Sequence, residues 1–166
     1  MIDFSSDRWI VIAVAVAAVS VVAVIGGLMT DVGPWYESLR FPPYRPPNWL
    51  FGPAWTTIYV FVAVGGILAY DAADGAWRTL LLGLFVVNSL LNVAWSPLFF
   101  KWRRPDWALI EWVPFWLSVA AIVATAYAIR PLSAAFLGVY LAWVTFAGWL
   151  NWRIVALNAP FGRARR

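Results

Sequence analysis

Tryptophan and asparagine are the residue types with which this chain could act on another molecule. Thirteen of its 166 residues are Trp, and it contains neither His nor Cys. Without those two residues the usual zinc, copper and iron–sulfur ligand sets cannot form, and a haem iron lacks its common axial ligands. A Ser-His-Asp triad, a Cys nucleophile and a disulfide are excluded in the same way. The sequence therefore predicts no metal site and leaves indole rings, amides and shape as the means of recognition.

Two apolar segments place such residues at helical spacing. In segment 79–100, Asn88, Asn92 and Trp95 follow one another at intervals of four and three, so they share one helix face. A second face lies in segment 134–157 and comprises Tyr140, Trp143, Ala147 and Asn151. An amide among lipid chains is costly unless it meets a partner or a cavity, so both faces should point inward. The amides could be hydrogen-bond links between helices, but two faces that each carry a Trp favour a lined pocket.

Glu111 is the one acidic residue well inside an apolar segment. It follows Trp107 by one helical turn, so one interpretation lets its carboxylate reach the membrane interface. The other interpretation makes Glu111 a partner for a ligand or for a basic group of the loop at 30–50. The residues alone leave both open.

Eleven of the thirteen tryptophans fall into two sets. Six lie near the ends of apolar segments, where an interfacial aromatic belt explains them: Trp9, Trp35, Trp77, Trp102, Trp107 and Trp152. Five others lie deeper, and a belt does not explain them: Trp55, Trp95, Trp116, Trp143 and Trp149.

The composition indicates that lipid surrounds these residues. Hydrophobic residues make up 63% of the chain and charged residues 12%, and the mean hydropathy is +0.76. Soluble domains are about 45–50% apolar and about 25% charged. Five segments reach the length of about 20 apolar residues that a membrane-crossing helix needs: 9–29, 51–70, 79–100, 107–128 and 134–157. We expect an all-α integral membrane protein, a single domain over 1–166 built as a bundle of five transmembrane helices.

Basic residues predict how the bundle lies in a membrane. The chain start carries Asp3 and Asp7 against Arg8, and its apolar run exceeds that of a signal peptide, so we interpret 9–29 as a retained helix. Three basic residues fall on the N-terminal side, namely Arg8, Arg78 and Arg130. Nine fall on the other side: Arg40, Arg45, Lys101, Arg103, Arg104, Arg153, Arg163, Arg165 and Arg166. In an inner membrane this bias places the N-terminus outside and the C-terminus and loop 30–50 in the cytoplasm. Anionic headgroups account for the net charge of +4 without nucleic acid.

Loop 30–50 and the residues after it are rich in proline and aromatic side chains, as in WYESLRFPPYRPPNWLFGPAW at 35–55. Proline stiffens such a segment towards an extended form, which lowers the entropy lost when it becomes ordered. Rigid aromatic rings above a bundle can form a lid over a flat apolar ligand. The alternative is an interfacial loop whose rings lie among the headgroups.

Four motifs of this chain resemble those of one family. The first is WYESLRFPPYRPPNWLFGPAWTTIY at 35–59, and LNVAWSPLFF (91–100), WALIE (107–111) and YLAWVTFAGWLN (140–151) follow in the same order. On these residues the chain resembles the TspO/MBR family of translocator proteins and tryptophan-rich sensory proteins, as a bacterial-type member.

This resemblance implies a five-helix bundle, often dimeric, with a cavity that opens towards the loop. Family members bind tetrapyrroles such as protoporphyrin IX, and animal members also bind cholesterol and synthetic ligands. Carried over by position, the ligand site would comprise Pro46, Pro47, Trp49, Trp55, Tyr59, Asn92, Trp95, Trp107, Trp143, Ala147 and Asn151. Asn88 and Glu111 join this candidate set on the arguments above. Trp55 and Trp143 match the pair that the family associates with light-dependent porphyrin breakdown.

The chain departs from the family pattern at several positions. Phe41 stands where many members have Lys, which weakens the case for a propionate partner there, and Tyr44 replaces a frequent Trp. Gly83 is followed four residues later by Val87 rather than by a small residue, which puts a dimer contact there in doubt. Two alternative small-residue faces exist, at Gly65/Ala69 and at Ala120/Ala124. The animal sterol motif needs a Tyr where this chain has Trp152.

Three hypotheses for function follow, in this order. The first is a membrane protein that binds a tetrapyrrole (protoporphyrin IX or haem-like) or another flat apolar ligand such as a sterol, in sensing, regulation or transport. Porphyrin faces stack on indole, and propionates would seek the basic loop side at Arg40 and Arg45. No cofactor is required, and the porphyrin is the ligand. The second is an enzyme that degrades porphyrin photo-oxidatively through Trp55 and Trp143, and the third is a scaffold that binds nothing. Membrane lipid and a second copy of the chain are the other expected partners.

Overall fold

The computed structural model describes residues 6–162, and five long helices dominate it. Their bounds are α1 Ser6–Met29, α3 Asn48–Ala72, α4 Gly75–Ser96, α5 Pro105–Ile129 and α6 Pro131–Asn158. A short helix, α2 (Pro34–Glu37), lies in the loop, and a π-helical turn, η1 (Pro97–Lys101), continues α4. Five of the described helical segments are long and apolar enough to cross a membrane, and the described residues contain no strand. The prediction of an all-α bundle of five membrane-length helices is confirmed.

The helices begin two to four residues earlier than the apolar runs indicate. α5 and α6 both start at a proline, Pro105 and Pro131, because proline fits the first helical position, where its missing N–H costs nothing. α4 starts at Gly75, whose φ of +37° favours glycine and lets the chain reverse after only Ala73 and Asp74. Short connections of this kind force neighbouring helices to run antiparallel.

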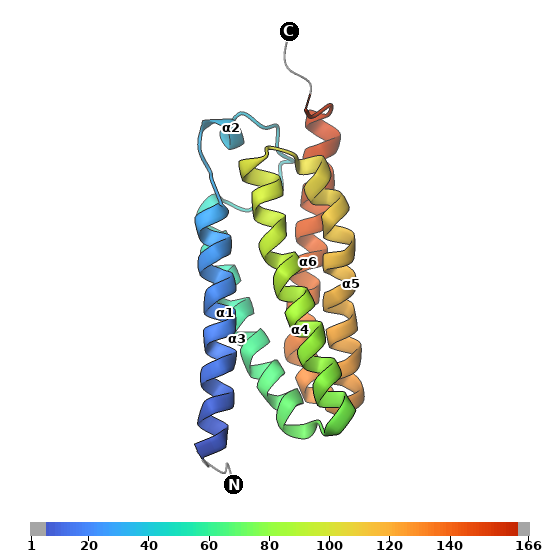
Figure 1. The fold of residues 1–166 in the computed structure, drawn as a ribbon. Helices are drawn as coiled ribbons and strands as arrows, with labels where there is room; N and C mark the ends of the chain where they lie inside the picture. The colour runs from blue at the N-terminus through green and yellow to red at the C-terminus, as the bar shows by residue number, and fades with distance from the viewer. Residues whose placement is uncertain (1–5, 163–166) are drawn as a thin grey trace.

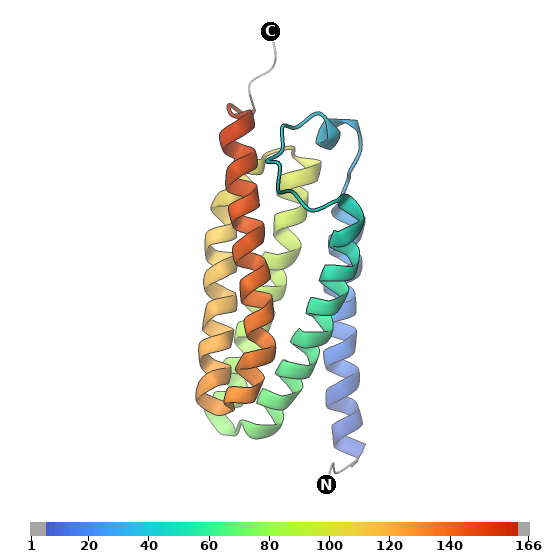
Figure 2. The ribbon, with the colours of Figure 1, turned by 180° about the vertical axis from the view of Figure 1, so that it is seen from behind.

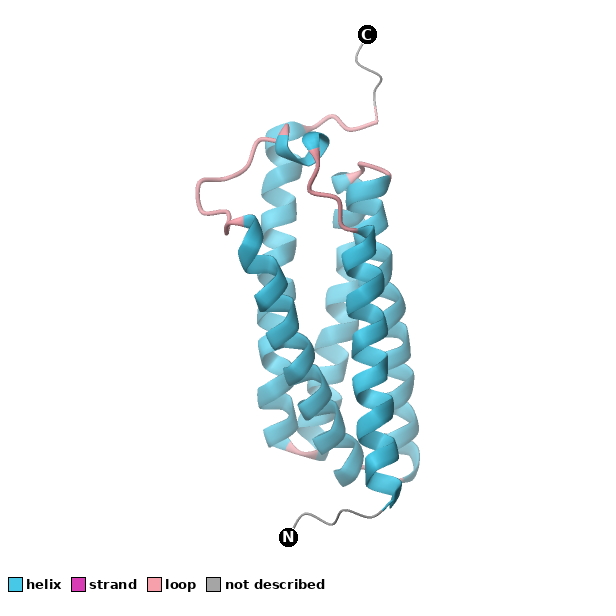
Figure 3. Cartoon of the chain, turned by 90° about the vertical axis from the view of Figure 1, so that its left-hand side faces the viewer, coloured by secondary structure: helices cyan, strands magenta, loops and turns pink. Residues whose placement is uncertain are grey.

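The long helices run along a common axis, and the two ends of the bundle differ (Figure 1). One end carries the segment with α2, the connection from η1 to α5 and the end of α6, and we call it the loop end. The start of α1 and the α3–α4 and α5–α6 connections lie at the opposite end (Figure 3). α5 packs against α4 and α6, α3 against α6, and α1 mainly against α3 and α4. The view from behind brings α3 and α6 to the front beneath the loop (Figure 2).

This arrangement separates the basic residues as the sequence predicts for the described part of the chain. Arg8, Arg78 and Arg130 belong to the end opposite the loop. Three other residues of the count, Arg163, Arg165 and Arg166, lie outside the described residues, as does Asp3 of the chain start.

The core follows the contacts between α3, α5 and α6. Val119, Ile122, Leu137 and Val144 are completely buried there, whereas α1 turns most of its apolar side chains outward, towards lipid. Gly65 and Ala69, proposed as a dimer face, lie inside the bundle instead. A Cβ on Gly65 would come 2.9 Å from Leu137 Cγ, so the small residue serves close packing of α3 on α6 within the chain.

Candidate ligand-binding site

A cavity of about 530 Å³, the upper cavity, lies near the loop end of the bundle. Side chains from all five long helices, from α2 and from η1 line it. Its volume falls within the range of about 300–1,000 Å³ that small-molecule sites occupy. Seven of the candidate site residues are brought together in its wall: Trp55, Tyr59, Asn92, Trp95, Trp143, Ala147 and Asn151.

Aromatic rings form much of this wall. Trp55 of α3 meets Trp143 of α6 edge to face, with 6.2 Å between the ring centroids, and stacks on Tyr59 at 5.4 Å. Trp95 stacks on Phe99 at 4.9 Å. The indole nitrogen of Trp143 is buried and donates to no atom of the described residues. A buried indole N–H normally has an acceptor, so the wall keeps one hydrogen-bond donor for a ligand.

Asparagine and tyrosine side chains form a hydrogen-bond network below the cavity. Asn92 Nδ2 donates to the Tyr140 hydroxyl at 2.9 Å, and that hydroxyl donates to Asn88 Oδ1 at 3.1 Å. Asn88 Nδ2 continues the chain to Ser118 Oγ at 2.9 Å, and the Tyr59 hydroxyl lies 3.4 Å from Asn92 Oδ1. Asn88 does not line the upper cavity, so it acts as a link between α4, α6 and α5. Asn92 does both: it links helices and borders the cavity.

Asn151 ties the cavity wall to the start of α5. It is 1% exposed. In the amide orientation that satisfies both polar atoms, it donates to Pro105 O and accepts from Leu109 N, each at 3.2 Å. Interhelical bonding thus accounts for Asn151, and its place in the wall is a second role.

The remaining candidates lie outside the wall of the upper cavity. Trp49 is 71% exposed at the start of α3, after Pro46 and Pro47. Trp107 is 44% exposed and holds the Arg104 guanidinium 4.1 Å from its ring centroid. Pro46, Pro47, Trp49 and Trp107 could therefore contact a ligand only at the rim of the cavity, at the loop end. Their positions in the sequence do not show whether they lie at the rim or in the wall.

The Glu111 side chain neither reaches the membrane interface nor hydrogen-bonds to a basic group among the described residues. Both of its carboxylate oxygens are buried, so the side chain does not extend to water at the interface. Neither oxygen has a hydrogen-bond partner among residues 6–162, and Glu111 lines neither cavity of the bundle described here. Among the described residues no group of three acidic side chains could hold a metal ion.

The loop is fixed over the upper cavity by contacts to α6. The backbone N–H of Arg40 donates to Asn158 Oδ1, and Asn158 Nδ2 donates to the Arg40 carbonyl, both at 2.8 Å. Tyr44 stacks on Trp149 with 4.3 Å between centroids. Tyr36 points inward and lines the cavity. The lid and the interfacial interpretations thus each describe part of the loop, since Tyr36 is buried while Tyr44 is exposed.

Arg45 carries a positive charge close to the cavity. Its guanidinium lies 3.9 Å from the Phe41 ring centroid and 5.7 Å from that of Tyr36. Burial raises the pKa of the Tyr36 phenol, and the charge of Arg45 opposes that shift. Phe41, which replaces the frequent Lys, therefore positions a cation rather than supplying one.

Several wall residues are absent from the candidate set. Phe99 and Phe100 turn inward because the π-helical turn after Ser96 rotates this part of α4. The sequence motif that contains both residues, LNVAWSPLFF at 91–100, is the signal that could have marked them as site residues. Trp112 and Phe115 of α5 also line the cavity, but no polar spacing marks them in the sequence. Ala23, Gly26 and Gly27 provide the α1 side of the wall.

Comparisons with known proteins agree with this arrangement. The family model described as the TspO/MBR family matches residues 13–157. The translocator protein of Bos taurus is 37% identical over 134 residues, which cover 80% of this chain and 79% of that protein. The tryptophan-rich protein TspO of Archaeoglobus fulgidus is 34% identical over 87% of this chain and 95% of its own length. The tryptophan-rich sensory protein of Cereibacter sphaeroides is 28% identical over 90% of this chain and 92% of its own length. With five membrane-length helices and a family match over most of its length, the chain belongs to the TspO/MBR family.

Proposed function

We propose that this membrane protein binds a tetrapyrrole such as protoporphyrin IX in the upper cavity and acts in sensing or transport. The observation that carries the proposal is the edge-to-face pair of Trp55 and Trp143 on the cavity wall. Indole faces suit a broad π-system, and the free N–H of Trp143 can donate to a polar group of the ligand. The absence of His from the chain favours a metal-free porphyrin over an axially ligated haem.

The propionates of such a ligand would point towards the loop end. Arg45 is a cation held beside the wall, over the rings of Phe41 and the wall residue Tyr36. A carboxylate that pairs with a guanidinium is better stabilised than one among hydrocarbon chains. We further propose that the loop end faces the cytoplasm of a bacterial cell, because the basic residues concentrate there.

A titration with protoporphyrin IX tests the site. Wild-type protein in detergent is expected to bind the porphyrin and shift its absorbance. Trp143→Ala is expected to weaken binding by about tenfold, which is 1.4 kcal/mol. Trp152→Ala is the matched control, because Trp152 is half exposed and lines neither described cavity. Equal affinity in wild type and Trp143→Ala would rule the pocket out. Competition by cholesterol then distinguishes a porphyrin site from a general site for flat apolar ligands.

A second candidate function is light-dependent breakdown of the bound porphyrin. The specific observation in its favour is that Trp55 and Trp143, both on the wall, lie 6.2 Å apart between ring centroids. In such a breakdown the light-excited porphyrin is oxidised and dioxygen, the oxidant, is reduced, and the two indoles beside the ligand would relay the electrons between them. Under illumination in air, Trp55→Phe/Trp143→Phe with the porphyrin bound is expected to lose absorbance more slowly than wild type. If the double variant bleaches at the wild-type rate, the enzyme hypothesis is rejected.

A further inference from the structure

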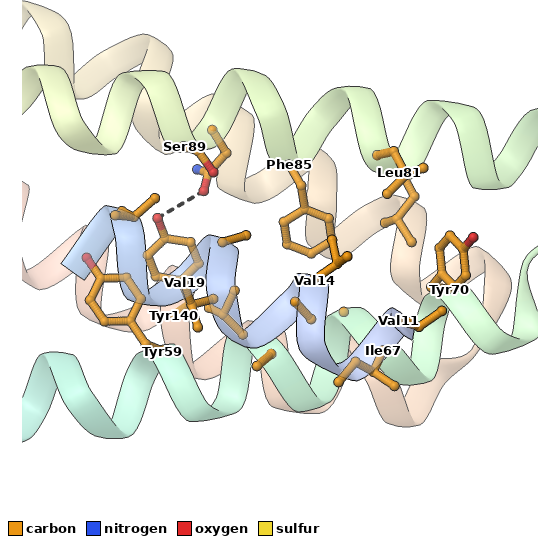
Figure 4. A pocket seen from close by; sticks show the side chains of 18 of the residues that line it. Val11, Val14, Val19, Tyr59, Ile67, Tyr70, Leu81, Phe85, Ser89 and Tyr140 are labelled. Atoms are coloured by element: carbon orange, nitrogen blue, oxygen red, sulfur yellow. Dashed lines mark hydrogen bonds between the residues drawn. The ribbon is translucent and has the colours of Figure 1, made fainter. Parts of the chain in front are cut away.

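A second cavity, the lower cavity, lies between α1, α3 and α4, further from the loop end than the upper cavity (Figure 4). Its volume is about 330 Å³ and most of its lining is apolar. Figure 4 shows Tyr59, Ser89 and Tyr140 gathered at one end of it and Leu81 and Tyr70 towards the other. The proposed tetrapyrrole site does not use this space.

The lower cavity is long and narrow. Its lining runs from Ile10 to Val22 along α1 and from Tyr59 to Tyr70 along α3, about 17 Å in each case at 1.5 Å per residue. The upper cavity covers a similar length of its helices but encloses about 530 Å³ rather than about 330 Å³. A slot of this shape suits a single hydrocarbon chain better than a ring system.

The slot reaches the outer surface of the bundle. Three of its lining residues, Ile10, Val14 and Leu82, are 62%, 62% and 49% exposed. All three lie inside membrane-length segments, so the medium outside them is the hydrocarbon of the bilayer. The acyl chains of the bilayer are therefore the molecules in direct contact with the opening of the slot.

A cation lies beside the end of the slot where a lipid headgroup would lie. Arg78 lies at the end of the bundle opposite the loop, where its guanidinium donates to the Ala73 carbonyl at 2.9 Å and covers the Tyr70 ring at 4.5 Å. Headgroups of a bilayer lie at that level, and a phosphate is a suitable partner for a guanidinium. Ser89 lines the slot at its inner end and marks how far an acyl chain would reach, since the terminal methyl group of such a chain needs no polar partner. Between the two ends the wall is apolar.

We propose that the lower cavity binds one acyl chain of a membrane phospholipid, with its headgroup beside Arg78 and the end of its chain near Ser89. The proposal is independent of the tetrapyrrole function, because the two sites share only Tyr59 and Asn92 in their walls.

The test is photochemical cross-linking in liposomes of phosphatidylethanolamine in which one palmitoyl chain carries a diazirine at its far end. After illumination, peptides that contain Ser89 and Tyr59 are expected to carry more label than peptides of the outward face of α5 around Ile110 and Leu117, which are 71% and 56% exposed. Label spread equally over these four positions would overturn the proposal.

Filling the slot provides the second arm of the experiment. Ala15→Phe and Ala18→Phe each place a ring in the slot from α1, and each is expected to lower the labelling of Ser89 by about tenfold. Ala17→Phe is the matched control on the exposed face of the same helix, which does not line the slot, and it should leave the labelling unchanged. Two filling variants are compared so that a folding defect in one does not decide the result. Wild-type labelling of Ser89 in a folded filling variant would refute the assignment, whatever the outcome of the porphyrin titration.

Discussion

Asn92 donates a hydrogen bond to the Tyr140 hydroxyl over 2.9 Å, and the Asn92 side chain borders both cavities of the bundle. Tyr140 passes the network on to Asn88, which borders only the lower cavity. Two amides one helical turn apart thus have different surroundings. Asn92 lies in the wall of the upper cavity, where it can contact a ligand, whereas Asn88 lies outside that wall and joins helices by hydrogen bonds.

This difference predicts that Asn88→Leu and Asn92→Leu separate stability from binding. Each variant should lower the stability of the folded protein by about 1 kcal/mol, the usual value of an interhelical hydrogen bond. Only Asn92→Leu should also weaken protoporphyrin IX binding, because Asn88 does not reach the upper cavity. Thermal unfolding in detergent and a porphyrin titration measure the two effects. An equal loss of affinity in both variants would contradict the assigned roles.

Arg45 is predicted to recognise the carboxylates of a tetrapyrrole rather than its ring. Because its guanidinium is held over Phe41 and Tyr36, Arg45→Gln should weaken binding of protoporphyrin IX by about tenfold. The dimethyl ester of the same porphyrin has no carboxylates, so its affinity should not change. Arg130→Gln is the control, since Arg130 lies between α5 and α6 at the end of the bundle opposite the loop. A similar loss for acid and ester would mean that Arg45 acts only by shaping the loop.

The fold was largely predictable because lipid imposes a simple rule on the chain. A helix that crosses a bilayer needs a long apolar run, and the runs at 107–128 and 134–157 sit inside helices that start only slightly earlier. The earlier starts depend on Pro105 and Pro131, which also carry a local signal. The lower cavity had no such signal, because it depends on how far α1 stands from α3 and α4.

The site was predictable where polar residues repeat at helical spacing and not elsewhere. The spacing of Asn92 and Trp95 is enough to place both on one face, and a buried amide must point inward. Burial could not be predicted for Trp107, because an aromatic ring at the start of a helix is as stable in the membrane interface as in a cavity wall. In the structure Trp107 is half exposed. Phe99 turns inward only because of the π-helical turn. A sequence pattern that assumes 3.6 residues per turn does not predict the direction of side chains in such a turn.

Glu111 is predicted to reduce the stability of the bundle. Both of its oxygens are buried and have no hydrogen-bond partner among the described residues, and an unpaired carboxyl group in such surroundings is costly. Glu111→Gln keeps the shape and removes the charge, so the midpoint of thermal unfolding should rise or stay equal. Porphyrin affinity should not change, because Glu111 lies outside the upper cavity. A clear fall in affinity would instead identify Glu111 as a partner of the ligand.

Gly148 is predicted to be the most sensitive glycine of α6. Its hydrogen faces the indole of Trp112, which donates to the Val144 carbonyl at 2.8 Å, and a Cβ at Gly148 would overlap that indole. Gly148→Ala should therefore force Trp112 out of its hydrogen bond and towards the upper cavity that it lines. We expect a loss of about 1–3 kcal/mol in stability, together with weaker porphyrin binding.

Gly138→Ala is the matched control in the same helix, because a Cβ there meets no atom within 4 Å. Alanine favours a helix over glycine, so this variant should be as stable as wild type or more so. Trp112→Phe gives the decisive comparison, since a smaller ring leaves room for the new methyl group. Combined with Gly148→Ala it should cost less than the sum of the two single changes, measured as free energies of unfolding. Strict additivity would show that the two residues do not compete for the same space, and the close approach of α5 and α6 would then need another cause.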